Sequence, residues 1–186
     1  MASNESLSWS RIDPTNSPPA ARSGHSAVIY NNSMYIFGGL GEYRFNDLFK
    51  FDFQTQTWTE IKPNDESKVP SKRCKHSACV YQNMMYIFGG WDSSGKLNDM
   101  YRYIFDRNEW ELVPCSNPPR PRSAHSVAIY QNAMYLFGGI GDNKFNDMYR
   151  FAFKTNQWTM VNQRNAPPRR SSYGGAHIYN NRLYLV

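Results

Sequence analysis

The feature that most constrains the fold is an apolar segment ending in two glycines, which recurs along the chain. It reads Met34-Tyr-Ile-Phe-Gly-Gly39, returns at residues 85–90 and 134–139, and begins again at residues 183–186. Glycine adopts positive φ at little cost and has no Cβ, so this segment predicts a buried strand whose end packs closely against other backbone. Self-similarity at a period of about 50 residues indicates an architecture of stacked repeats.

Each unit carries the same landmarks around this strand. A tyrosine precedes it, an Asn-Asp pair follows it, and Trp58, Trp110 and Trp158 close the three full units. Residues 48–53 alternate between apolar and polar side chains, which is typical of a strand. No stretch has a useful helical period, so we predict an all-β chain with units at about residues 23–62, 74–113 and 123–162, and the start of a fourth at residues 171–186.

The segment before the first unit resembles the end of another unit. Residues 7–13 alternate in polarity, and Trp9 lies thirteen residues before Arg22, much as Trp110 lies twelve before Arg122. We therefore predict that residues 7–13 form the outer strand of a closing blade.

The predicted sheets carry aromatic residues on both faces, so each sheet needs a neighbour on both sides, and radial stacking provides this with few open edges. The double glycine, the tyrosine before it, the aspartate after it and the closing tryptophan resemble the kelch repeat. The resemblance covers residues 7–186. It implies a partial kelch β-propeller of about three and a half four-stranded antiparallel blades.

Within that family, the Arg-x-x-His and Asn-Asp steps are most similar to leucine-zipper-like regulators and multi-kelch scaffold proteins. The resemblance implies a non-catalytic scaffold or substrate-recognition module. Kelch domains joined to BTB domains act as ubiquitin ligase adaptors, and these 186 residues contain no BTB sequence. A closed ring would need about 300 residues at this period, so we expect the sequence to be part of a longer protein. The fourth unit departs from the pattern, because it has an extra residue after Arg170 and lacks the histidine.

The loops that follow the double glycine and those that lead into the first strand should emerge at the same end of every sheet. Residues that change between units are free for recognition there. Trp91, at a position held by Leu40 and Ile140, either anchors a partner or packs under its loop. The candidate partner-binding residues are Arg22, Tyr43, Arg44, Arg73, Trp91, Lys96, Arg122, Asn143, Lys144 and Arg170.

Polar residues that recur in every unit have a structural interpretation. We predict that the recurring histidines bridge neighbouring blades through hydrogen bonds. The recurring arginines either pair with the recurring aspartates or converge on an acidic ligand. The recurring residues are His25, His76 and His125 with Asp47, Asp99 and Asp147.

The charge balance favours an acidic partner. The chain has 21 basic and 15 acidic residues and a net charge of +6 without a basic block, which argues for a solvated surface. Nucleic-acid binding would rest on the net charge alone, and we do not expect it. No apolar run approaches the roughly 18 residues of a membrane span. The three cysteines lack disulfide or metal spacing, and Cys79 occupies a position that suits a small buried residue. We therefore expect a cytoplasmic protein without a membrane segment.

Catalytic motifs are missing from the sequence, so we expect no enzyme activity, cofactor or metal. The favoured partner is another protein, bound through an acidic segment. The alternative is a kelch-type enzyme or a propeller that binds a small anion or sugar. Open propeller edges also predict self-association. The long insert at residues 63–72 is predicted to be a disordered loop rather than a cover over the binding end.

Overall fold

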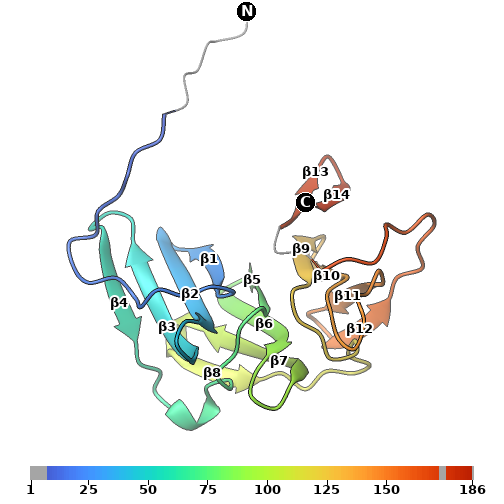
Figure 1. Ribbon diagram of the computed structural model, residues 1–186, viewed down its shortest axis with the longest axis horizontal. Coiled ribbons are helices and arrows are strands. Elements are labelled where there is room, and N and C mark those ends of the chain that lie inside the picture. Colours follow the sequence, from blue (N-terminus) through green and yellow to red (C-terminus); the bar gives the residue numbers. More distant parts are fainter. Residues whose placement is uncertain (1–7, 172–174, 186) are drawn as a thin grey trace, which may run out of the picture.

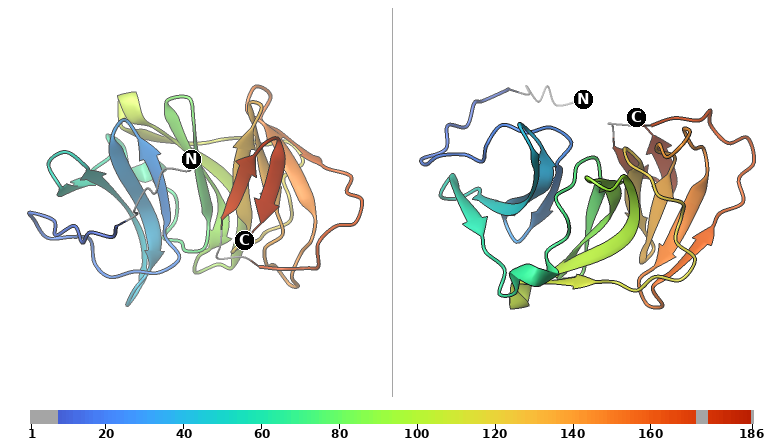
Figure 2. Two further views of the ribbon diagram at one scale, coloured as in Figure 1. Left: turned by 90° about the horizontal axis from the view of Figure 1, so that it is seen from above. Right: turned by 60° about the horizontal axis from the view of Figure 1, so that its bottom comes forward.

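The computed structural model describes residues 8–171 and 175–185. These residues form three four-stranded antiparallel sheets and one two-stranded sheet, with no α-helix among them. The sheets follow one another around an arc, and the first strands of neighbouring sheets contact each other (Figures 1 and 2). This is the all-β, partial propeller arrangement that the sequence predicts, and each sheet is one blade.

The strands of each blade follow the chain in order from the inside outward. Blade 1 contains β1 (Ser26–Tyr30), β2 (Ser33–Leu40), β3 (Arg44–Asp52) and β4 (Thr57–Ile61). Blade 2 contains β5 (Ser77–Tyr81), β6 (Met84–Trp91), β7 (Lys96–Ile104) and β8 (Glu109–Leu112). Blade 3 contains β9 (Ser126–Tyr130), β10 (Ala133–Phe137), β11 (Met148–Ala152) and β12 (Gln157–Met160). Blade 4 has β13 (Ala176–Tyr179) and β14 (Arg182–Leu185), and short 3₁₀ helices span Glu66–Lys68 and Phe105–Arg107.

The double glycine marks the place where blades join. Gly38 has a φ of 62° and Gly39 a φ of 105°, and the register of β2 against β3 shifts here. The Gly39 N–H donates to the Arg73 carbonyl of blade 2 at 2.8 Å, and a Cβ on Gly38 would lie 2.7 Å from that oxygen. The same hydrogen bond recurs in the next two blades. The glycines thus allow the backbone of one blade to touch the next.

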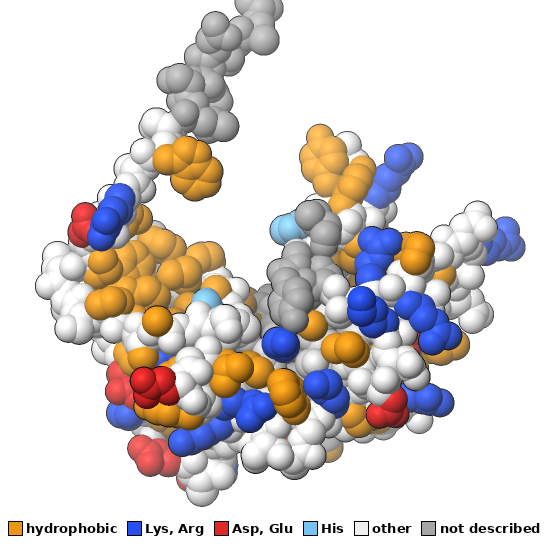
Figure 3. Space-filling model, in the orientation of Figure 1, with side chains coloured by type: hydrophobic (Ala, Val, Ile, Leu, Met, Phe, Trp, Pro, Cys, Tyr) orange, Lys and Arg blue, Asp and Glu red, His pale blue; other side chains and the backbone are white. Residues whose placement is uncertain are grey.

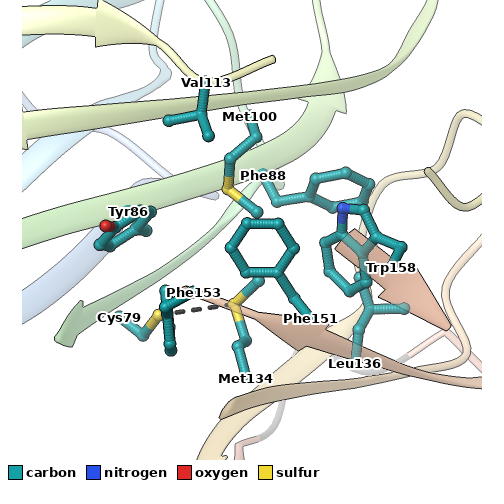
Figure 4. Packing of buried hydrophobic residues seen from close by; sticks show 10 residues of the cluster. All are labelled: Cys79, Tyr86, Phe88, Met100, Val113, Met134, Leu136, Phe151, Phe153 and Trp158. Carbon is teal, nitrogen blue, oxygen red and sulfur yellow. Dashed lines mark hydrogen bonds between the residues drawn. The ribbon is translucent and has the colours of Figure 1, made fainter. Parts of the chain in front are cut away.

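Aromatic side chains fill the spaces between the blades. Trp110 packs against Phe37 of blade 1 with ring centroids 4.8 Å apart, and Trp158 packs against Phe88 of blade 2 at 4.9 Å. Burial raises the pKa of the Cys79 thiol to about 12, as expected for a small core residue. Figure 4 shows the core between blades 2 and 3, which contains Cys79, Tyr86, Phe88, Met100, Val113, Met134, Leu136, Phe151, Phe153 and Trp158.

The segment before a blade covers the edge of that blade's outer strand. The Asn16 side chain donates to the Trp58 carbonyl at 2.7 Å and accepts from the Trp58 N–H at 2.8 Å. Before blade 3, the Ser116 carbonyl accepts from the Trp158 N–H at 3.0 Å. Unpaired strand edges promote aggregation, so these segments protect the circumference of the propeller.

Residues 8–13 lie outside the four sheets, and the outer strand of a closing blade predicted for residues 7–13 stays a prediction. The structure assigns no strand to them, Trp9 is 102% exposed, and residue 7 lies outside the described residues. An outer strand pairs with the third strand of its own blade; β3, β7 and β11 already have neighbours on both sides, and the blade that residues 7–13 would close is not among the described sheets.

The insert at residues 63–72 also differs from the prediction, because it is an ordered segment packed on blade 2. Asp65 accepts a hydrogen bond from the Ser67 N–H and begins the turn at Glu66–Lys68, which contacts β8. The Asn64 N–H donates to the Asn108 carbonyl at 2.9 Å. Val69 packs against the core between blades 1 and 2, so the insert closes the side of that interface.

Candidate partner-binding rim

One end of the sheets carries both kinds of loop that the sequence places together. Isolated backbone bridges join them between Ser23 and Leu40, Cys74 and Trp91, and Ser123 and Ile140. We call this end the rim. It comprises residues 18–24, 40–46, 69–75, 91–98, 117–124, 140–147 and 164–171.

Three of the recurring arginines are buried inside their own blades. The Arg122 side chain is 0% exposed and binds Asp147 through Nη1 at 2.6 Å and Nη2 at 2.9 Å. Its Nη1 also donates to the Gly138 carbonyl at 2.8 Å. Arg22 with Asp47 and Arg73 with Asp99 repeat this arrangement.

The expectation that these three arginines contact a partner is therefore wrong. The side chains of these arginines are 4%, 1% and 0% exposed for Arg22, Arg73 and Arg122, and an aspartate carboxylate binds each guanidinium. Arg170, the fourth of the series, is partly buried and donates from Nε to the Pro168 carbonyl at 3.2 Å. The ion pairs formed by described residues do not include Arg170, so it stays a candidate.

Two of the three recurring histidines, His76 and His125, bridge blades as the sequence predicts. His76 Nε2 and Ser26 Oγ of blade 1 are 2.8 Å apart, and His125 Nε2 and Ser77 Oγ of blade 2 are also 2.8 Å apart. Burial, with a smaller contribution from a neighbouring arginine, lowers the pKa of each imidazole to about 3. Neither Nδ1 has a hydrogen-bond partner among the described residues. The two rings are thus held neutral.

Acid is expected to destabilise the protein through these two histidines. The unfolded chain binds a proton on each below the ordinary pKa of 6.5, whereas the folded chain binds none until about pH 3. Their contribution to stability is therefore complete above pH 6.5 and decreases as the pH falls, by about 1.4 kcal/mol per histidine and pH unit. Urea unfolding at pH 7 and pH 5.5 checks this. His76→Gln should flatten the pH dependence, and an unchanged dependence would contradict the assignment.

Arg44, Trp91 and Lys96 form a cluster that joins blades 1 and 2. Arg44 Cζ lies 4.4 Å from the centre of the Trp91 ring, and Lys96 Nζ lies 4.1 Å from it. All three are candidate residues from the sequence, and they come from the start of β3, the end of β6 and the start of β7. Trp91 thus holds two cations, since the face of an indole attracts positive charge.

The two cations of this cluster lack a counter-ion. The ion pairs formed by described residues include neither Arg44 nor Lys96, and Arg44 Nε has no hydrogen-bond partner among these residues. The nearest acidic neighbour in sequence, Asp92, accepts hydrogen bonds from Ser71 and Ser94. Burial alone would raise the pKa of Asp92, but these hydrogen bonds outweigh burial and hold it below its ordinary value. Asp92 is thus engaged by serines, and neither cation of the cluster is within ion-pair distance of a described carboxylate.

A hollow of about 530 Å³ adjoins the cluster between the loops of blades 2 and 3. Lys96 lines it together with Asn143, a further candidate, and with Arg120 and Arg169, which the sequence did not single out. Arg120 could have been identified from the sequence, since it stands two residues before a recurring arginine, at a position where the first unit has Ala20. Figure 3 shows basic side chains gathered on the part of the visible face formed by blades 2 and 3.

Tyr43 and Lys144 occupy exposed loop tips. Tyr43 is 59% exposed. The centre of its ring lies 4.8 Å from that of Phe45 and 5.7 Å from Lys72 Nζ. Lys144 is exposed, and a backbone bridge joins it to Ile140. Both can contact a partner without rearrangement of the blades.

Within residues 8–171 and 175–185, no three His, Cys, Asp or Glu side chains are grouped so as to hold a metal ion. The described part of the chain also has no helix long and apolar enough to cross a membrane.

Comparison with known proteins agrees with the fold. Residues 1–186 match the model of the KLHDC2/KLHL20/DRC7 Kelch-repeats domain. The chain belongs to the kelch-repeat family. The Drosophila melanogaster leucine-zipper-like transcriptional regulator 1 homolog is 42% identical over 115 residues, which cover 57% of this chain and 12% of that protein.

Two human kelch relatives are more distant. Host cell factor 2 is 34% identical over 115 residues, covering 51% of this chain and 14% of the relative. Kelch domain-containing protein 10 is 33% identical over 109 residues, covering 56% of this chain and 25% of the relative. The kelch chain thus spans at most a quarter of the length of these three relatives.

Proposed function

We propose that this protein is a non-catalytic interaction module that binds an acidic segment of another protein on the rim, with Arg44, Trp91 and Lys96 at the centre of the site. The observation that supports this most is the pair of cations held on one indole without a counter-ion. Proteins of the kelch family generally mediate protein interactions or substrate recognition, which supports the same role.

The chemistry of the cluster favours a carboxylate. Like charges that are brought together repel, and an anion bound at the cluster relieves this repulsion while forming charge-assisted hydrogen bonds with Arg44 or Lys96. Trp91 sets the position of both cations, so the site needs little reorganisation when the ligand arrives. Lys96 also lines the hollow with Arg120 and Arg169. The carboxylates in its lining are Asp142 and Asp147, and Asp147 is already bound by Arg122, so a partner segment with several acidic residues can continue from the cluster into this hollow.

Charge reversal at the cluster is expected to weaken the binding of acidic peptides strongly. The probe is a fluorescent peptide of alternating glutamate and glycine, measured by fluorescence anisotropy against the matched glutamine peptide. The double variant Arg44→Glu with Lys96→Glu should weaken binding about tenfold or more, which corresponds to at least 1.4 kcal/mol. Added salt should weaken the wild-type complex, because these charges lie near the surface.

The matched control reverses a charge at the other end of the sheets. Lys154 is exposed in the turn between β11 and β12, away from the rim loops. Lys154→Glu changes the net charge by the same amount as one of the rim substitutions and should leave binding near the wild-type value. Equal losses in both proteins would show a general charge effect and would exclude a site at the cluster.

A further inference from the structure

The hollow between blades 2 and 3 is lined by three basic side chains from three different segments. Lys96 stands at the start of β7, Arg120 in the loop before β9 and Arg169 in the segment after β12. Within the described part of the chain, none of these side chains forms a hydrogen bond or an ion pair. Three positive charges thus border one space without an anion between them.

The carboxylates of the lining do not neutralise these cations. Asp147 is bound by Arg122 at 2.6 and 2.9 Å, and Asp142 is exposed and forms no ion pair with a described residue. Three cations and one unpaired carboxylate leave a surplus of two positive charges. A phosphate monoester carries about −1.5 to −2 charges at pH 7, so one phosphate matches a surplus that one carboxylate would only half balance.

An asparagine adds an uncharged donor to the hollow. Asn46 and Asn98 stand at one position in blades 1 and 2, and their Nδ2 groups donate to the Pro70 and Pro119 carbonyls, each at 3.1 Å. Asn146, their equivalent in blade 3, lines the hollow, and its side chain has no hydrogen-bond partner among the described residues. The phosphate group offers three strong acceptor oxygens to such donors.

The corresponding place between blades 1 and 2 shows that Arg120 has no structural task. Ser71 stands there at the position of Arg120, and its hydroxyl donates to Asp92 at 2.8 Å and accepts from Arg73 Nη2 at 3.0 Å. The polar groups of that junction therefore bind one another. Between blades 2 and 3 an exposed arginine replaces the serine, and its guanidinium remains available to a ligand.

We propose that this hollow binds a phosphorylated serine or threonine within the acidic segment of the partner, with the phosphate held by Arg120 and Arg169. The inference rests on the proposed function, because the cluster of Arg44, Trp91 and Lys96 holds the acidic residues beside the phosphate. Guanidinium groups suit this task, since their planar fork binds phosphate through two parallel hydrogen bonds. The volume of about 530 Å³ is that of a small-ligand site and accommodates a phosphorylated side chain with its neighbours.

Fluorescence anisotropy with three matched peptides tests the proposal. Each is the alternating glutamate and glycine peptide, with serine, glutamate or phosphoserine at its centre. The wild type should bind the phosphoserine peptide about tenfold more tightly than the serine peptide, because the phosphate adds charge-assisted hydrogen bonds. The glutamate peptide should bind much like the serine peptide. If it binds as tightly as the phosphoserine peptide, the hollow responds to negative charge alone and the proposal is wrong.

A double variant assigns the preference to the hollow. Arg120→Gln with Arg169→Gln should remove the preference for phosphoserine and weaken the serine peptide much less, because the cluster is unchanged. Both arginines are exposed, so circular dichroism should show unchanged sheets. The matched control, Lys144→Gln with Lys154→Gln, removes two exposed charges that do not line the hollow and should keep the preference. Equal loss of the preference in both double variants would show a general charge effect and overturn the proposal.

The peptide results separate this inference from the proposed function. Binding of the serine peptide without a gain from phosphoserine would overturn the phosphate site alone, whereas a failure of all three peptides to bind would overturn both proposals. Free O-phosphoserine lacks the flanking glutamates, and each phosphodiester of a uridine oligonucleotide carries one charge. Both should therefore compete only at much higher concentrations than the phosphoserine peptide. Competition by either at the concentration of the peptide would overturn the assignment to a phosphorylated protein.

Discussion

Replacing Asp147 with asparagine is expected to lower the free energy of unfolding by about 3 to 5 kcal/mol, because it leaves a buried guanidinium without its counter-charge. The Arg122 side chain is 0% exposed and bound by both carboxylate oxygens at 2.6 and 2.9 Å. Its only other charge-stabilising contacts among the described residues are carbonyl oxygens and the rings of Phe145 and Tyr149. Asparagine preserves the shape of the side chain, so the loss reports the charge.

Urea denaturation of wild type and Asp147→Asn measures this loss. The control is Asp13→Asn, whose partner Arg11 and own side chain are 87% and 73% exposed, and it should leave the midpoint unchanged. The double variant Arg122→Met with Asp147→Leu should recover part of the lost stability, because replacing both members of a buried pair removes the uncompensated charge. A single-variant loss no larger than that of Asp13→Asn would show that the arginines are not structural.

The fold was predictable because each unit repeats the same local rules. The double glycine, the closing tryptophan and the alternating third strand all occur at fixed spacing. A strand that is hard to predict in one unit can therefore be placed from its equivalent in the next unit. The Asn31-Asn32 turn illustrates this, since both residues adopt positive φ, at 42° and 55°, as required by a tight hairpin.

Features that occur once were not predictable in the same way. Residues 8–13 alternate like a strand, but the third strand with which they would pair is not among the described sheets. The insert at residues 63–72 has the polar composition of a loop, yet Val69 reaches the core and Asn64 pairs with blade 2. In both cases the conformation of the segment depends on contacts with another blade, which the local sequence does not show.

The candidate site shows the same division. Variation between units identified Arg44, Trp91 and Lys96 separately. The contact of both cations with the Trp91 ring depends on how blade 1 packs against blade 2, which the sequence does not show. Recurrence alone should have excluded Arg22, Arg73 and Arg122 from the candidate partner-binding residues, because a residue present in every unit has a structural role in that unit. Their inclusion followed from their place on the rim, and burial by the blade's own aspartate decides against it.

Replacing Gly89 with alanine is expected to destabilise the protein by about 2 to 5 kcal/mol, combining the cost of left-handed backbone with that of steric overlap. Gly89 has a φ of 59°, and a Cβ there would lie 2.8 Å from the Arg122 carbonyl oxygen and 2.9 Å from the Leu97 carbonyl oxygen. The first oxygen belongs to blade 3 and accepts the Gly90 N–H at 2.9 Å. The added methyl group must therefore push two blades apart.

Gly95 separates the two contributions to this loss. It also has a positive φ, 130°, but a Cβ there would meet nothing within 4 Å. Gly95→Ala thus carries only the backbone cost, and its loop can relax into solvent. In thermal and urea unfolding, Gly89→Ala should lose clearly more stability than Gly95→Ala. Because blades 2 and 3 meet at Gly89, the loss should also loosen the neighbouring His125 contact and speed hydrogen exchange in β9. Equal effects of the two substitutions would mean that the close approach between blades does not explain why a glycine is needed at position 89.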